Sequence, residues 1–337
     1  MNLFSTKNRP FDLGPFPLEK LNRLSGPLDL DAIPPMQPLD FSRHGPESLA
    51  HAIARFMAMM DTVRDGKIVH GEAEIPTDPQ ERSRHLKAAA YYFDASMVGI
   101  ARLEKPHFLE RSLRNPMIDD IKEELEAGQP KSFASGVDAI YADVLESARV
   151  RLGPVDHHTH ALVFLVEYAR DPEENEPGTE WFVDTQAERA ALLTSNVAVV
   201  LANYLRMLGH EARAHTATTS DIDLNRLGVS AGLCALEGVD LVNPFVGRRF
   251  GLSAVTTTLD LAADDPLGAD AGRAGWQSHG PSWWLGKGTD RRAATAEPYR
   301  DRVFRLGPHP FETIKRRMTP TTFIDEERVP RFPKRAD

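Results

Sequence analysis

Apolar residues recur every three or four positions in three stretches of the chain, and each stretch predicts a helix. The first runs from about 47 to 66 and carries an apolar stripe formed by Leu49, Ile53, Phe56, Met57 and Met60. The second runs from about 78 to 93 and starts with the N-terminal signature TDPQE. The third, from about 185 to 208, is apolar on most sides and precedes Gly209, so we expect a buried helix that ends at this glycine.

Shorter apolar runs between these helices predict strands. They lie at 97–103, 161–169 and 252–261, and the last is rich in β-branched residues. GHEARAH, at 209–215, leads into a further short strand, whereas 105–154 has the pattern of helices and loops. Because helices and strands interleave without strict alternation, we expect an α/β or α+β fold with a central sheet flanked by helices.

Three regions differ in composition. Residues 1–46 contain eight prolines, which favour an extended arm, and the apolar residues among them favour an arm that lies along a surface rather than a disordered one. Residues 47–267 hold all the predicted helices and strands. Residues 268–337 are rich in loop-forming residues and end in a proline-punctuated tail. We therefore predict an arm, one main domain and a C-terminal extension.

Composition and charge exclude several classes of function. The chain has 337 residues, of which 41% are hydrophobic and 26% charged, as in a globular domain. Its net charge of −9 argues against non-specific nucleic-acid binding, which needs a basic face. No apolar run is long enough to span a membrane, and the first residues lack a secretory signal, so we expect a cytoplasmic protein. The single cysteine, Cys234, excludes an internal disulfide, a Cys-only zinc site and a self-contained iron–sulfur cluster.

Two clusters of polar residues suggest chemistry, although each has an ordinary structural explanation. In DHHTH at 156–160, His158 and His160 would point to one side of an extended segment, as half of a metal site whose third ligand comes from elsewhere. A polar start to the next strand explains the same residues, and we assign no metal ligand. Asp260, Asp264 and Asp265 could serve acid–base work, but acidic residues after a strand more often form a solvated turn or cap.

Arginine and tryptophan pairs are the other candidates. Arg248 and Arg249 lie on a glycine-containing loop, which suits recognition of a carboxylate or phosphate, while a surface ion pair is the alternative. Trp283 and Trp284 are adjacent, so both cannot easily face one core, and a pocket or partner surface is an alternative role. Cys234 is predicted to be a small buried apolar residue.

Several motifs, in order, resemble those of the corrinoid-dependent reductive dehalogenases. HLKAAAYYFDASMVGIARL resembles the family's K-x-A-A-x-x-F-G-A-x-x-V-G-I, and RMLGHEA resembles R-x-L-G-Y-x-A. AGL at 231–233, NPFVGRRFG at 243–251 and the segment 255–266 resemble the family's next three motifs. The proline-rich start, RPFDLGPFPLEKL, resembles the catabolic, cytoplasmic branch. The resemblance covers most of residues 9–267.

The resemblance implies a nitroreductase-like architecture and a cobalamin cofactor served by two four-iron clusters. The family's cluster cysteines have no counterpart after Pro266, and no tyrosine stands between Tyr168 and Tyr204, where the family places a proton donor. In the catabolic branch a degenerate copy of the corrinoid domain precedes an active one. We therefore expect a catalytically degenerate corrinoid-domain module without an iron–sulfur cluster. It would act with a cluster-bearing subunit or second half, through Trp283, Trp284 and the C-terminal tail.

Two alternatives remain open at the level of sequence. In the first, the chain is an active cobalamin-dependent dehalogenase that receives electrons from a separate redox protein and acts on a halogenated organic molecule. His215 or His210 would then replace the proton donor, and Arg249 or Arg248 would hold a substrate carboxylate. The corrinoid contacts would come from Arg248, Arg249, Asn243, Trp283 and Trp284. In the second alternative, the chain carries a corrinoid without turnover.

Overall fold

A four-stranded antiparallel sheet forms the centre of the protein. The computed structural model describes residues 10–41, 45–68, 71, 73–127, 145, 152–169, 176–182 and 184–268. The strand order is β1-β3-β8-β4, which correspond to Met97–Arg102, His160–Glu167, Phe250–Thr257 and Ala212–His215. β3 and β4 both pair with β8, and His160 and Ala212 both lie opposite Thr257. The first residues of β3 and β4 therefore flank the last residue of β8.

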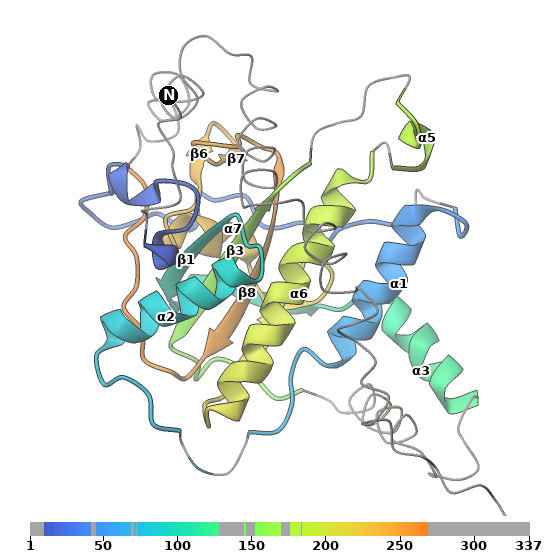
Figure 1. Ribbon diagram of the computed structural model, residues 1–337, viewed down its shortest axis with the longest axis horizontal. Helices are drawn as coiled ribbons and strands as arrows, with labels where there is room; N and C mark the ends of the chain where they lie inside the picture. Colours follow the sequence, from blue (N-terminus) through green and yellow to red (C-terminus); the bar gives the residue numbers. More distant parts are fainter. Residues whose placement is uncertain are drawn as a thin grey trace, which may run out of the picture.

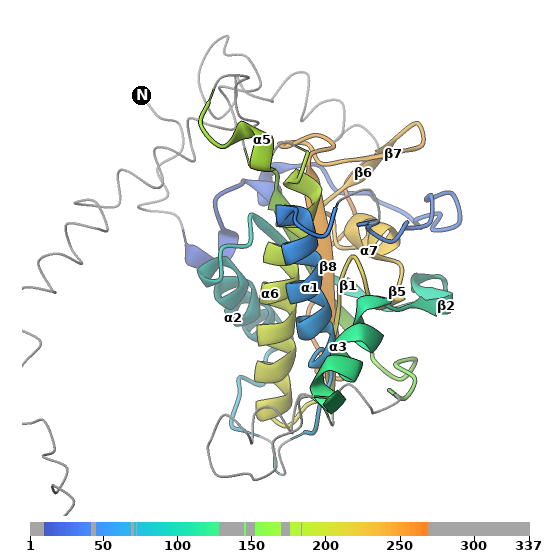
Figure 2. The same ribbon diagram turned by 90° about the vertical axis from the view of Figure 1, so that its right-hand side faces the viewer.

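Helices cover one face of this sheet, and a mixed layer covers the other (Figures 1 and 2). α6 (Gln186–Met207) and α2 (Pro79–Tyr92) pack on the first face, α1 (Leu49–Thr62) lies against α6, and α3 (Met117–Ala127) lies beside α1. α7 (Leu224–Ser230) packs on the second face. Alternate residues of each strand enter the two cores, as a pleated sheet requires. The predicted α+β class, with a sheet flanked by helices, is confirmed.

The proline-rich arm completes the core on the second face. Over residues 10–41 it contains the short 3₁₀ turns η2 (Phe11–Leu13) and η3 (Leu18–Lys20) but no α-helix. Arg23 fixes the arm through hydrogen bonds to the carbonyls of Gly232 and Asp265, at 3.2 and 2.8 Å. Five apolar side chains of the arm are buried in the core with α7, namely Phe16, Leu18, Leu30, Ile33 and Met36. The described part of the arm is therefore packed against the rest of the protein.

Capping residues in the sequence correctly marked the ends of the three long helices. Ser48 precedes α1 and accepts a hydrogen bond from the N–H of His51, and Asp78 does the same for Gln80 at the start of α2. α6 ends with Gly209 at a φ of 95°, where the N–H groups of Gly209 and His210 bond back into the last turn. The strands predicted at 97–103, 161–169 and near GHEARAH are β1, β3 and β4.

The structure contains two strand pairs that were not predicted, and one predicted strand ends earlier than expected. β2 (Phe108–Leu113) is a strand where only helices and loops were expected, and it pairs with β5 (Ser220–Ile222). The hairpin of β6 (Ala235–Glu237) and β7 (Asp240–Val242) was not foreseen. The remaining short elements are α5 (Thr179–Phe182) and η4 (Lys105–His107). The strand expected at 252–261 is β8, which ends at Thr257.

The apolar stripe predicted for α1 was partly wrong. Leu49 and Phe56 are each 46% exposed. The buried side instead combines Met57 with the alanines Ala50, Ala54 and Ala58, each at 0% exposure. Small side chains let α1 approach α6 closely, so the larger residues on the next face remain outside.

α6 passes a test for a membrane span by length and composition alone. It has 22 residues, and 56% of its most apolar 18-residue window is buried inside the protein. Its apolar residues pack against the sheet, including Val197, Leu201 and Leu205. The hydropathy of α6 is thus explained by its place in the core.

Candidate functional site

A network of charged side chains lies at the β4 edge of the sheet. Arg64, two residues after α1, binds Asp221 at 3.0 Å, and Arg213 of β4 binds Asp65 at 2.6 Å and Asp221 at 3.2 Å. Burial alone would raise the pKa of Asp221. Arg64 and Arg213, together with the Ser112 hydroxyl, outweigh burial and hold the pKa of that carboxyl well below its usual range. Asp221 is therefore ionised and ties the loop after α1 to the sheet.

We expect Asp221→Asn to lower the free energy of unfolding by about 2 kcal/mol at pH 7, since contacts to buried guanidinium groups lose their charge. The folded pKa of Asp221 lies below its unfolded value of about 4. The wild-type advantage is therefore present above about pH 4 and declines as the pH falls towards the folded pKa. Denaturation between pH 7 and pH 2 measures it. Asp260→Asn, at a carboxylate whose side chain is 70% exposed beside Arg82, is the control and should cost under about 0.5 kcal/mol. A wild-type advantage that is independent of pH would contradict the prediction.

A row of oriented hydrogen bonds leads from this network to the surface. Burial, and next the charge of Arg64, hold the pKa of His215 well below its usual value, so its imidazole is neutral. The Asp221 N–H donates to His215 Nδ1 at 3.2 Å, which leaves the ring proton on Nε2, 2.9 Å from Thr256 Oγ1. Thr256 can then donate to Nδ1 of His158 at 2.8 Å. These bonds fix the orientation of the His158 ring.

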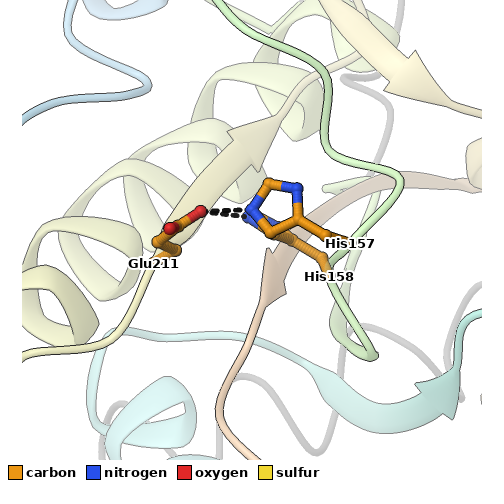
Figure 3. A group of neighbouring side chains, drawn as sticks. All are labelled: His157, His158 and Glu211. Atoms are coloured by element: carbon orange, nitrogen blue, oxygen red, sulfur yellow. Dashed lines mark hydrogen bonds and ion pairs between the residues drawn. The ribbon is translucent and has the colours of Figure 1, made fainter.

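His157, His158 and Glu211 meet at the end of this row (Figure 3). The Nε2 atom of His158 lies 3.7 Å from Oε2 of Glu211, and His157 Nε2 hydrogen-bonds the same oxygen. Burial, and next the charge of His157, lower the pKa of His158 to about 4. The hydrogen bond from His157, which outweighs the effect of burial, lowers the pKa of Glu211. Two imidazoles and one carboxylate thus share one point at the surface.

The alternation of an extended segment predicted that His158 would share a side with His160. In the structure His158 lies beside His157 instead. The segment is a turn up to His158, whose N–H bonds the carbonyl of Val155 at 3.0 Å, and β3 starts only at His160. A turn brings neighbouring side chains to one side, whereas a strand sends them to opposite sides. His160 Nδ1 bonds the Thr159 hydroxyl at 3.0 Å instead.

Asn243 and the two candidate proton donors lie within the folded framework. His215 is 0% exposed on β4. His210 lies directly after Gly209, and its N–H bonds the carbonyl of Leu205 in the last turn of α6. Asn243 is also 0% exposed; its amide donates to Leu233 O at 2.7 Å, and its oxygen accepts two backbone N–H groups. The side chains of His215 and Asn243 are thus held by their own local structure, whereas the buried Nε2 of His210 has no hydrogen-bond partner among the described residues.

The arginine candidates lie on the loop between β7 and β8. Arg248 forms an ion pair with Asp240 at 2.9 Å, and both side chains are largely exposed. The Arg249 guanidinium lies 5.4 Å from the centre of the Tyr168 ring, a cation–π contact. Trp283 and Trp284 lie outside the described residues, as does most of the predicted extension 268–337.

An open groove runs between the arm, the first turns of α6 and the start of β8. Its volume is about 430 Å³, and Tyr168, the ring on which Arg249 stacks, lines it. The other lining residues are Met36, Gln37, Pro38, Leu39, Asp40, Ala187, Ala191, Ala217, Leu224, Asn225, Phe250, Gly251 and Leu252. The groove thus combines apolar walls with the cation of Arg249 nearby.

The acidic residues after β8 include one that closes the sheet. Asp264 donates its N–H to Ile100 O at 2.8 Å and accepts the Ile100 N–H at 2.7 Å, while Lys87 binds its other oxygen at 2.6 Å. The free edge of β1 is thereby paired. Asp260 and Asp265 are exposed. The sequence analysis did not foresee this edge-closing role of Asp264.

Comparison with known proteins identifies the class. No protein-family model and no curated protein matches the chain. The chain is similar to solved structures of the catabolic reductive dehalogenase NpRdhA, at 33% identity and a TM-score of 0.58 for the N-terminally tagged protein. A complex of that enzyme with 3-bromo-4-hydroxybenzoic acid gives 0.59. A reductive dehalogenase structure that suggests a mechanism for B12-dependent dehalogenation gives 0.58, again at 33% identity.

The chain is therefore similar to reductive dehalogenases in both sequence and fold. Each of these matches covers 80% of this chain. The resemblance inferred from the motifs is thereby confirmed. The chain spans only 32% of the length of those proteins.

Proposed function

We propose that these residues form the non-catalytic corrinoid-domain module of a reductive-dehalogenase-type assembly. The module packs beside a second half or a separate subunit that bears the clusters. The length relation supports this proposal, because the chain corresponds to about a third of a complete relative. Binding of the halogenated substrate and carbon–halogen cleavage then belong to the other part of the assembly. We expect the assembly to be cytoplasmic.

The observation that carries the proposal is that two of the candidate side chains, Asn243 and His215, are fully buried and hydrogen-bonded within the fold. A corrinoid contact needs side-chain groups that can turn towards a ligand, and the amide of Asn243 is committed to its own turn. A proton donor needs a pKa near the working pH and access to substrate. His215 has neither, since it is fully buried and its pKa is strongly lowered.

The size of the groove also supports a module that does not bind a corrinoid. Pockets for drug-sized ligands have volumes of about 300–1,000 Å³. The groove of about 430 Å³ lies at the lower end of this range, and a cobalamin is larger than a drug-sized ligand. This groove is therefore too small to hold a cobalamin.

Cys234 supports a separate source of electrons. It is 0% exposed, and burial raises its pKa, so it is a neutral thiol in the core. A cluster needs several thiolates, and these 337 residues hold one cysteine. Reducing equivalents would therefore enter through the partner or second half.

A titration with hydroxocobalamin tests the proposal. We expect no saturable change in the corrin absorbance bands or in tryptophan fluorescence at micromolar protein. Saturable binding with a band shift would overturn it. Halide release with an external reductant would then separate an active enzyme from a corrinoid carrier, and Arg249→Ala, compared with Arg248→Ala, would test the arginine near the groove.

A further inference from the structure

We propose that His157, His158 and Glu211 bind a divalent transition-metal ion of the zinc type at the β3–β4 end of the sheet. The proposal concerns a site outside the groove and does not depend on the proposed function. It rests on three observations: the strand register that brings the side chains together, the distances among their ligand atoms, and the hydrogen bonds that hold His158 from behind.

The register of the sheet explains why residues so far apart in the sequence meet. β3 and β4 run in the same direction on either side of β8, and both start opposite Thr257. His157 and His158 precede β3, and Glu211 precedes β4. The backbone of Glu211 is anchored by its carbonyl, which accepts from the Thr257 hydroxyl at 2.7 Å. The three side chains therefore converge over the last residues of β8.

The distances are suitable for one ion. The ligand atoms of the three residues all lie within 4.8 Å of one another. Bonds of about 2.0–2.1 Å in a tetrahedral zinc site place neighbouring ligand atoms about 3.3 Å apart. The separation of 3.7 Å between His158 Nε2 and Glu211 Oε2 is close to this value. The contact of His157 with Glu211 must open, which both side chains can do because each is about half exposed.

His158 has the surroundings typical of a metal-binding histidine. Its side chain is 4% exposed, and Nε2 is the ring atom that faces the cluster. Coordination through Nε2 places the ring proton on Nδ1, so the Thr256 hydroxyl, which donates to Nδ1 in the metal-free protein, turns to accept this proton at 2.8 Å. Such outer hydrogen bonds orient the ring and raise ligand basicity. Asp156 lies 3.9 Å from Nδ1 of His157, which is within ion-pair distance but too far for a hydrogen bond.

The ligand set indicates the class of ion. Two imidazoles and a carboxylate suit zinc and similar borderline dications, whereas magnesium and calcium prefer oxygen ligands alone. Three protein ligands at the surface leave a fourth position for water or another small ligand. Arg213, the cation closest behind the site, is already paired with Asp65 and Asp221.

Titration of the metal-stripped full chain with Zn²⁺ by calorimetry, and with Co²⁺ by visible absorption, tests the site. We expect one equivalent to bind and the Co²⁺ bands to indicate nitrogen and oxygen ligands in low coordination number. His157→Ala, His158→Ala and Glu211→Gln should each weaken binding at least tenfold. His160→Ala, at the neighbouring histidine outside the cluster, should bind like the wild type.

Thr256 is a positioning residue in this scheme. Thr256→Val should weaken metal binding about tenfold to a hundredfold, and Thr256→Ser should restore it, because only the hydroxyl matters. Circular dichroism and the thermal midpoint in EDTA identify any variant that fails to fold. Zn²⁺ should raise the midpoint of the wild type and of His160→Ala but not that of Glu211→Gln. Wild-type affinity in both His158→Ala and Glu211→Gln, or no binding by the wild type, would overturn the proposal.

Discussion

Gly99→Ala is expected to lower the free energy of unfolding by about 3 kcal/mol. Gly99 lies in the middle of β1 and faces the end of α7. A Cβ at this position would lie 2.2 Å from the carbonyl oxygen of Ala231 and 3.0 Å from its Cβ. The obstacle is backbone at the end of a packed helix, so it cannot turn away as a flexible side chain would. α7 or β1 must move, and the core between them would lose packing.

Urea denaturation of purified Gly99→Ala, followed by circular dichroism, measures the loss. Gly26→Ala is the matched control, because a Cβ there meets nothing within 4 Å and the backbone is unstrained. It should change the stability by less than about 1 kcal/mol. Equal stability of the two variants would show that α7 does not rest on β1 as the structure has it. A soluble but loosened Gly99→Ala protein would show a reduced m-value.

The sequence predicted those elements whose signals are local. Ser48 and Asp78 mark the starts of α1 and α2, and Gly209 marks the end of α6. These signals are local because a cap needs only the residues of one turn. β3 could be predicted because its side chains are buried on both faces, which produces an unbroken apolar run. Short elements that depend on partners distant in the sequence were missed. β2 has mixed polarity and pairs with a strand of only three residues, and α7 is a helix of seven.

The candidate site was predicted only in part for a related reason. The DHHTH segment offered His158 and His160 as a possible half of a metal site, but no metal ligand was assigned, and the structure groups His158 with His157 instead. Glu211 is 54 residues from His157, and only the shared register with β8 brings it there. The choice between His157 and His160 depended on where the turn ends and the strand begins, a boundary of one or two residues. The residues of the segment itself carry no signal for the point at which the turn ends and the strand begins.

In the structure, two of the family motifs have clear roles in maintaining the fold. The motifs around Gly209 and Asn243 indicated the family, and in the structure they terminate a helix and stabilise a tight turn. Residues that maintain a fold persist in a module even where its chemistry has moved elsewhere. The motifs therefore indicate the fold, and the hydroxocobalamin titration tests the activity.

Asp61→Ala is expected to cost about 4 kcal/mol of unfolding free energy. Asp61 lies near the end of α1 at 3% exposure. Its Oδ2 accepts from Thr218 at 2.7 Å, from Thr219 at 2.8 Å and from the Asn115 amide at 3.2 Å. Oδ1 accepts from Thr216 at 2.8 Å. Removal of the carboxyl leaves these buried donors without an acceptor and separates α1 from the turn between β4 and β5.

Asp61→Asn distinguishes the loss of hydrogen bonds from the loss of charge. Burial raises the pKa of Asp61, and the four hydrogen bonds offset this only in part, so the surroundings stabilise the charge of this carboxylate less well than water does. The Asn oxygen can replace Oδ2 for its three donors, and its amide can donate to Thr216, so we expect a cost of only about 1 kcal/mol. Asp119→Ala, at an exposed carboxylate paired with Arg114, is the control and should cost about 0.5 kcal/mol or less. Denaturation of all three variants at pH 7 measures the order. An Asn variant as unstable as the Ala variant would mean that the charge itself holds α1 in place.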